Sequence, residues 1–155
     1  MRTLDTILAE TPLFHDLEPR ILKLMAGCAS NVKFDVDEYL CRQDAEANRF
    51  FLVRHGKVAL DIYVPQVGSR TIDTAREGDV LGWSWLVPPY RWHVGARALE
   101  RTRALEFDGA CLRGKCETDP ELGYQLYRRF AQVMYETLQA THLQLLDMYG
   151  EPRRN

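Results

Sequence analysis

The sequence lacks a long apolar run, and this absence excludes one class of protein. No stretch of its 155 residues approaches the roughly 20 consecutive apolar residues that a membrane-spanning helix requires. The first residues, Met-Arg-Thr-Leu-Asp-Thr, contain no apolar core of a signal peptide. We therefore expect a cytoplasmic protein that does not enter a membrane.

An excess of charge of one sign is also absent. The 20 Lys and Arg residues are balanced by 22 Asp and Glu residues, which gives a formal net charge of −2. The basic residues are spread along the chain, whereas a stand-alone nucleic-acid-binding protein concentrates them on one face or helix. The 46% of hydrophobic and 27% of charged residues are ordinary for a globular domain.

Closely spaced metal ligands are missing as well. The four histidines are isolated, so the His-x-His pair of a cupin-like metalloenzyme is absent and that class is a remote alternative. The four cysteines lack the second Cys-x2–4-Cys pair of a structural zinc site. These residues are His15, His55, His93 and His142, and Cys28, Cys41, Cys111 and Cys116. We expect free, reduced thiols, with Cys111 and Cys116 as the pair to test for redox chemistry, and no catalytic residue, metal or cofactor.

The apolar spacing predicts helices first and then strands. Residues 3–10 and 18–29 carry apolar residues at helical spacing. After Ser30 the pattern changes to short apolar stretches between turn residues. Eight strands are expected, over Val32–Phe34, Tyr39–Cys41, Phe50–Arg54, Lys57–Tyr63, Thr71–Ala75, Val80–Leu81, Trp92–Ala98 and Ala104–Phe107. Eight short strands without intervening helices are typical of a jelly-roll β-barrel.

The pattern becomes helical again after the last strand. Asp108 is a candidate N-cap for a short helix over Ala110–Lys115, and Asp119-Pro120 is a typical start for a long helix that runs to about Tyr149. The sequence therefore predicts one mainly β domain over residues 1–155, with flanking helices. It would have N-terminal helices in 1–30, an eight-stranded barrel in 31–107 and C-terminal helices in 108–150.

The long C-terminal helix has two apolar faces. The stripe formed by Leu122, Leu126, Phe130 and Val133 can face the barrel. A second stripe recurs in steps of four and three, the a/d pattern of paired helices. Its members are Tyr127, Ala131, Met134, Leu138, Thr141, Leu145 and Met148. A helix of about 45 Å exceeds what one small barrel covers, so we expect a homodimer through this stripe. The alternative is a single broad surface that faces the core.

Residues 78–98 carry the strongest indication of function. A turn that combines glycine with aromatic residues and one cation is suited to hold a ligand, because backbone N–H groups can reach an anion where side chains are small. The candidate ligand-binding residues are Gly82, Trp83, Ser84, Trp85, Arg91, Trp92 and His93. The alternative is a hydrophobic plug, in which the tryptophans fill one end of the barrel.

The order of helices, eight strands and a long helix resembles the cyclic nucleotide-binding domain of catabolite-activator-like (Crp/Fnr-like) regulators, kinase regulatory subunits and gated channels. The resemblance covers essentially the whole chain. Its most specific segments are Leu13-Phe14, Asp37–Asp44, the Phe50–Val58 hairpin, the Gly78–Gly82 turn and Arg97-Ala98. The resemblance implies that the turn after Gly82 is the phosphate-binding cassette, where the family uses a glutamate for the ribose and an arginine for the cyclic phosphate.

This cassette departs from the family pattern of Gly-Glu followed by Arg-Ser/Thr-Ala. Trp83 stands at the glutamate position and Trp92 at the arginine position, and Arg91 is the neighbouring cation that could replace the latter. Thr137 falls where the family often places a threonine against the purine. Loss of the two polar contacts implies that cyclic AMP and cyclic GMP bind about a hundredfold more weakly, or worse.

We therefore expect a non-catalytic regulatory or sensor domain that binds a nucleotide-like or other anionic small ligand and signals through a protein partner. Family transcription factors continue into a helix-turn-helix module, whereas this sequence ends at Glu151-Pro-Arg-Arg-Asn. We expect no sequence-specific DNA binding by this polypeptide alone. The alternative is a dimeric scaffold whose pocket is filled by its own tryptophans.

Overall fold

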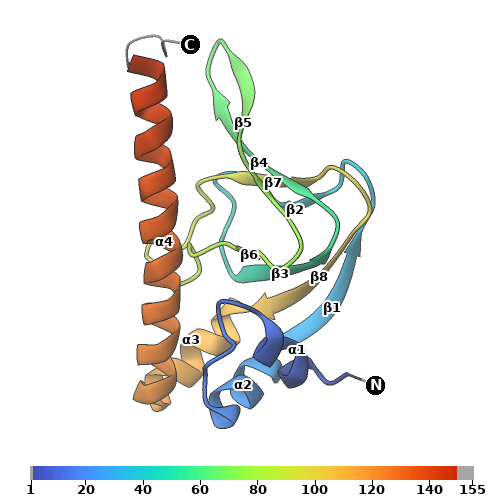
Figure 1. Cartoon of the computed structure of the whole chain (residues 1–155), viewed down its shortest axis with the longest axis vertical. Coiled ribbons are helices and arrows are strands. Elements are labelled where there is room, and N and C mark those ends of the chain that lie inside the picture. The colour runs from blue at the N-terminus through green and yellow to red at the C-terminus, as the bar shows by residue number, and fades with distance from the viewer. Residues whose placement is uncertain (1, 150–155) are drawn as a thin grey trace, which may run out of the picture.

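The computed structural model describes residues 2–149, which form four helices and eight strands in the predicted order (Figure 1). The elements are α1 (Leu4–Glu10), α2 (Pro19–Ala26), β1 (Ala29–Phe34), β2 (Tyr39–Cys41), β3 (Arg49–His55), β4 (Val58–Val64), β5 (Gly68–Ala75), β6 (Val80–Leu81), β7 (Gly95–Ala98), β8 (Thr102–Asp108), α3 (Gly109–Thr118) and α4 (Pro120–Tyr149). No helix in the described part of the chain combines the length and the apolar character that crossing a bilayer requires.

The strands form two antiparallel sheets of four strands each. Their orders are β1-β8-β3-β6 and β2-β7-β4-β5. The two sheets face each other across a core that includes Phe51 and Ala104 from the first sheet and Val58 and Ala96 from the second. This double-sheet arrangement is the jelly roll that the eight short strands predict. We refer to the two sheets together as the barrel.

A second core covers the outer face of the first sheet. Phe50 and Leu52 of β3 point into this core, whereas Phe51 and Val53 point into the barrel, because successive side chains of a strand alternate between its faces. Phe50 stacks on Phe107 of β8 with ring centroids 4.3 Å apart. The four helices supply the opposite side of this core (Figure 1). β3 is thus buried on both faces, which explains the uninterrupted apolar run from Phe50 to Val53.

Both C-terminal helices begin at the predicted caps. The Asp108 side chain accepts a hydrogen bond from the Cys111 backbone N–H at 3.0 Å, and Asp119 accepts one from the Leu122 N–H at 3.2 Å. These bonds satisfy backbone donors that a helix start leaves free. α4 is helical up to Tyr149, the last residue that the structure describes, so its predicted stop at Gly150 and Pro152 lies outside the described residues.

The two apolar stripes of α4 have different surroundings. Leu122, Leu126 and Phe130 are fully buried in the second core. The second stripe is mostly exposed: Tyr127, Ala131, Leu138, Thr141, Leu145 and Met148 are exposed and Met134 is half-buried. The alternative of one broad surface facing the core is therefore wrong. Figure 1 shows why, since the C-terminal half of α4 lies above the helices that share its core, at the level of the protruding β4–β5 hairpin.

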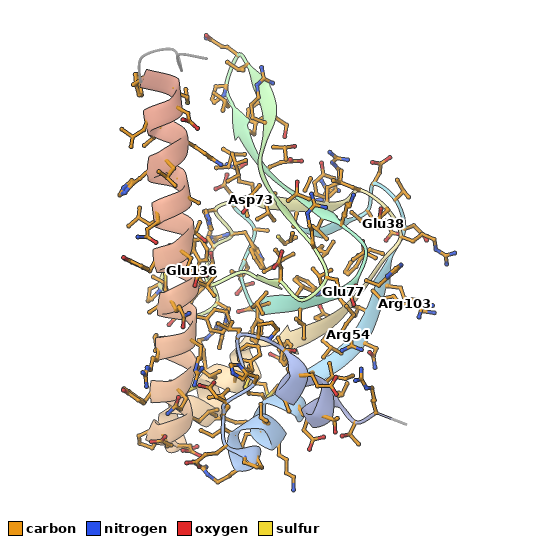
Figure 2. The ribbon with its side chains drawn as sticks, viewed as in Figure 1. Glu38, Arg54, Asp73, Glu77, Arg103 and Glu136 are labelled. Carbon is orange, nitrogen blue, oxygen red and sulfur yellow. A yellow bond between two sulfur atoms is a disulfide. The ribbon has the colours of Figure 1, made fainter. Side chains whose placement is uncertain are left out.

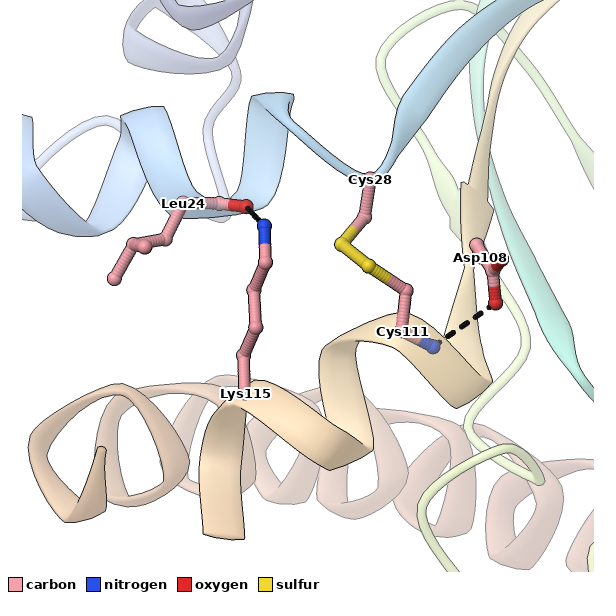
Figure 3. The surroundings of a disulfide bond; sticks show 5 residues. All are labelled: Leu24, Cys28, Asp108, Cys111 and Lys115. Atoms are coloured by element: carbon pink, nitrogen blue, oxygen red, sulfur yellow. Dashed lines mark hydrogen bonds between the residues drawn. A yellow bond between two sulfur atoms is a disulfide. The ribbon is translucent and has the colours of Figure 1, made fainter. Parts of the chain in front are cut away.

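A disulfide joins Cys28 to Cys111, which corrects the expectation that all four thiols are free (Figure 3). The pairing of β1 with β8 causes this contact, because it sets Ala29 opposite Phe107 and so brings the start of α3 to the end of the α2–β1 link. Cys111 and Cys116, the pair singled out for a redox test, are not joined, because five positions along a helix rotate a side chain by about 140° beyond one turn. Cys41 and Cys116 are free.

Candidate functional site

A cavity of about 550 Å³ lies between α4 and the barrel. This volume is within the range of roughly 300–1,000 Å³ that small-molecule sites occupy. Strands β4 to β7 and the turn after β6 form one wall, and the link between α1 and α2 contributes Pro12 and Leu13. On the helix side the lining residues are Gln132, Val133, Glu136, Thr137 and Ala140. The cavity therefore lies between the turn after Gly82 and the middle of α4.

The floor of the cavity is apolar and includes Trp92. Gly82 has a positive φ of 97°, and a Cβ atom built on it would lie 2.5 Å from the Trp92 ring. A larger residue at position 82 would therefore face both a strained backbone and a clash. The Trp92 ring also packs near Phe51, with ring centroids 6.4 Å apart, and Trp92 is only 5% exposed. Trp92 thus fills the space directly above the Gly82 turn.

Trp83 and His93 form an aromatic pair in the lining of the cavity. Their ring centroids are 4.7 Å apart with an interplanar angle of 28°. Nδ1 of His93 also lies 3.4 Å from the hydroxyl of Ser84. Partial desolvation of the ring, stacked on Trp83, lowers the pKa of His93 below its ordinary value of 6.5, so the imidazole is mainly neutral at pH 7. The pair offers a flat surface without a positive charge.

The ionised side chains that line the cavity are all carboxylates. They are Asp73, Glu77, Asp79 and Glu136, and no Lys or Arg is among the lining residues that the structure describes. None of these carboxylates forms an ion pair within residues 2–149. Figure 2 labels Glu136 on α4 and Asp73 on the side of the barrel that faces this helix. The rim of the cavity is therefore negative at neutral pH and repels an anion.

Five of the eight predicted ligand contacts line this cavity, namely Gly82, Trp83, Trp92, His93 and Thr137. Trp85 does not, and this is a correction. Its side chain is fully buried in the second core, where it stacks on Phe50 at 5.0 Å between ring centroids. Ser84 is also buried and contributes no surface to the cavity. The backbone over residues 83–86 is a turn, closed by a hydrogen bond from the Leu86 N–H to the Trp83 carbonyl at 2.9 Å. This turn separates Trp83, in the cavity lining, from Trp85, in the second core, which sequence order alone does not reveal.

Arg91, the predicted phosphate cation, does not line the cavity either. Its backbone pairs with Glu46 in an isolated antiparallel bridge, and its guanidinium donates a hydrogen bond to the Asp44 carbonyl at 3.1 Å. Because neighbouring side chains in such extended backbone point to opposite sides, Trp92 faces inward and Arg91 outward. The expectation that Arg91 replaces the missing arginine is therefore corrected.

The rim carboxylates are the feature that sequence reasoning missed. Asp79 lies within residues 78–98, the segment already singled out, and Glu77 directly precedes that segment, so their sequence position was a usable signal. Asp73 and Glu136 lie 63 positions apart in sequence, and only the packing of α4 against the barrel brings both to one cavity. Among residues 2–149, no group of three or more His, Cys, Asp or Glu side chains is placed to hold a metal ion.

Comparisons with known proteins agree with this architecture. A sequence model of the cyclic nucleotide-binding domain family matches residues 31–119. A proposed cyclic nucleotide-binding protein from Geobacter metallireducens superposes with a TM-score of 0.78 at 25% identity, over 89% of this chain and 99% of that chain. The sensor domain of the transcriptional regulator DNR from Pseudomonas aeruginosa gives 0.70 at 16% identity, over 87% and 91%.

A third similar structure belongs to a longer chain. The catabolite activator protein of Thermus thermophilus superposes with a TM-score of 0.68 at 23% identity, over 88% of this chain and 63% of that chain. The superposition shows that the matched part of the longer protein shares the fold of this chain. No curated protein matches the sequence.

Proposed function

Because the chain belongs to the cyclic nucleotide-binding domain family, whose members are generally regulatory, we propose that it is a non-catalytic sensor domain. Its ligand would bind in the cavity between the barrel and α4. The main support for this proposal is that both the barrel and α4 line the cavity, with Trp83 on the barrel side and Thr137 on the helix. A ligand that contacts both sides favours one position of α4 over others. Binding would thus alter the part of α4 that extends beyond the barrel.

The proposed ligand has a flat ring system, and cyclic AMP and cyclic GMP would bind weakly. Trp83 and Trp92 occupy the positions where the family uses a glutamate and an arginine, and both line the cavity. The predicted substitute, Arg91, points away from it. A flat ring can stack on the Trp83–His93 pair, whereas a cyclic phosphate would meet the carboxylates of the rim.

The exposed stripe of α4 supports a homodimer. Leu138 is 53% exposed and Leu145 is 45% exposed, and both lie on the a/d pattern that pairs helices. We propose that residues 1–155 act as one domain, that two copies pair through this stripe, and that the dimer signals to a protein partner without reading a DNA sequence itself.

A cytoplasmic location remains a prediction. It bears on the disulfide, because disulfides are rare in a reducing cytosol. In such a compartment we would expect the Cys28–Cys111 bond to be reduced for part of the time.

Calorimetric titration with cyclic AMP and cyclic GMP tests the ligand proposal, together with native mass spectrometry of the purified protein. We expect dissociation constants above the micromolar range for both nucleotides, and a retained small molecule of other chemistry in the mass spectrum. Thr137→Val would weaken binding of that molecule without changing the fold, because the residue is only half-buried. Submicromolar binding of either nucleotide would contradict the proposal.

A ligand-free scaffold is the second candidate, and one observation favours it. The Trp92 ring already fills the space above Gly82 and is almost fully buried. If this reading is correct, the purified protein retains no molecule and its melting temperature does not respond to any ring-containing compound. The remaining cavity of about 550 Å³ favours the ligand-binding candidate over this one.

A further inference from the structure

The charge of the cavity rim comes from three separate parts of the fold. Asp73 belongs to β5, Glu77 and Asp79 to the turn before β6, and Glu136 to α4. Side chains of like charge around one opening repel each other, and a bound cation would relieve that repulsion. Arg76 lies beside Glu77 in sequence but is exposed and does not line the cavity. Asp79 accepts a hydrogen bond from the Arg76 backbone N–H and Glu136 accepts one from the Gln132 amide, but no described cation pairs with any of the four carboxylates.

The aromatic pair favours the same sign of charge. The face of an indole ring carries partial negative charge and attracts a cation that lies over it. Trp83 lines the cavity with His93 stacked beside it, and the neutral His93 ring adds no repulsion toward a cation. Aromatic stacking and electrostatic attraction thus select one kind of ligand, which is flat and positively charged.

The floor of the cavity excludes a small hydrated metal ion. Phe51, Leu81 and Trp92 form apolar surface there, whereas Mg²⁺ and Ca²⁺ require several oxygen ligands or retained water molecules. An organic ring can cover this surface and remove it from water, which is favourable. The apolar floor therefore selects a carbon-rich cation.

We propose that the cavity binds a flat aromatic cation, such as a positively charged nitrogen heterocycle. The ring lies between α4 and the Trp83–His93 pair, and the positive charge faces Asp73 and Glu136. This inference rests on the proposed ligand-binding function and names its ligand class. It replaces the anionic ligand expected from the sequence.

Three probes of matched shape and different charge test the inference. They are the N-methylacridinium cation, neutral acridine and the acridine-9-carboxylate anion, each measured by equilibrium dialysis with the full chain at pH 7.5. We expect the cation to bind at least about tenfold more tightly than the anion at low salt, with acridine between them. The ratio should shrink in 0.5 M salt, because the Debye length falls to a few ångströms (about 4 Å) and exposed carboxylates are screened.

Variants of the exposed rim separate charge from stacking. Asp73→Asn with Glu136→Gln should weaken cation binding about tenfold while acridine binding stays unchanged. The matched control is Glu100→Gln with Glu121→Gln, which removes two exposed carboxylates that do not line the cavity. Trp83→Ala should weaken all three probes, and an unchanged far-ultraviolet spectrum would show that this variant is folded.

The outcomes distinguish the inference from the function on which it rests. If the anion binds as tightly as the cation, or if Asp73→Asn with Glu136→Gln leaves their ratio unchanged, the charge assignment is wrong while ligand binding stands. If none of the three probes binds at millimolar concentration, the cavity does not accept a flat ring and the proposed function is itself wrong. If the control variant alters the ratio as much as the rim variant does, binding is nonspecific and the site is overturned.

Discussion

Residues 120–134 of α4 are built into the core, whereas residues 135–149 extend beyond it. In the first half Leu126 and Phe130 are fully buried under the outer face of the first sheet. In the second half Leu138, Leu146 and Met148 are between 53% and 75% exposed, although they are no less apolar. Apolar spacing therefore identifies the faces of a helix, but the extent of the barrel decides which residues are buried in a single chain.

The boundary between the two halves coincides with the cavity. The lining residues of α4 run from Gln132 to Ala140, so a ligand would contact the helix where it leaves the core. Up to that point α4 is held by buried side chains. Beyond it, residues 138–149 of the helix are all exposed.

Phe130→Ala should have the largest effect, because it removes the last fully buried side chain of the first half. The Phe130 ring packs against Phe50 at 5.0 Å and Trp85 at 5.3 Å between ring centroids. We expect a loss of about 3–5 kcal/mol in the free energy of unfolding, measured by urea denaturation. The matched variant Leu138→Ala in the second half should change the unfolding free energy of the monomer by less than about 0.5 kcal/mol. Equal effects of the two would contradict the comparison.

Removal of the Cys28–Cys111 disulfide should have the next largest effect. The bond fixes α3, against which the first half of α4 packs. Cys28→Ala with Cys111→Ala should lower the free energy of unfolding by about 2–4 kcal/mol, because the unfolded chain regains the freedom of a long closed loop. Urea denaturation with and without dithiothreitol provides the measurement. The control is Cys41→Ala with Cys116→Ala, which should leave the sensitivity of the protein to reductant intact.

Leu138→Glu with Leu145→Glu should separate the proposed dimer without unfolding either chain. Like charges at facing a/d positions repel, while both residues are exposed within one chain. Sedimentation velocity should show the monomer mass for this variant and the dimer mass for the parent. Leu143 is 64% exposed and lies outside the stripe, so Leu143→Glu should remain dimeric. A parent protein that is already monomeric at micromolar concentration would show that the stripe does not pair.

The smallest effect should be a pH dependence of stability that arises from His93. This residue lines the cavity at the boundary between the two halves of α4. Its pKa is lower in the folded protein than the ordinary 6.5 because burial disfavours the imidazolium. The unfolded chain therefore binds the proton more readily, so stability falls as the pH drops below about 6.5 and is complete above it. Urea midpoints at pH 7.5 and 5.5 should differ less for His93→Gln than for the parent. An equal difference would mean that other groups cause the pH dependence.

Local signals in the sequence were sufficient for most of the fold. The caps Asp108 and Asp119 each act within three residues, and the eight strands are separated by their own turns. The seventh strand is shorter than the predicted Trp92–Ala98, because Trp92 pairs with the Ala45 backbone as part of a loop instead. The predicted start of this strand was wrong because the apolar pattern at Trp92 fits both a strand and a buried loop.

The candidate site was predictable only in part for the same reason. Gly82 and Trp83 lie within one turn, so the sequence alone placed them together. The inward face of Trp92 and the outward face of Arg91 depend on a bridge to Glu46, which is remote in sequence. The disulfide and the negative rim also depend on tertiary packing, since their members come from segments far apart in the chain.

The disulfide also determines how the molecule would respond to mechanical force. Cys28 and Cys111 are 83 positions apart, and all eight strands lie between them. A pull on the two ends of the chain would pass through the covalent bond, so α1, α2, α3 and α4 could be extended while the barrel carried no load. A stretched chain spans about 3.5 Å per residue, so the closed loop withholds roughly 290 Å of extension until the bond is reduced. Single-molecule stretching would record this as an additional length that is released only in the presence of a reductant.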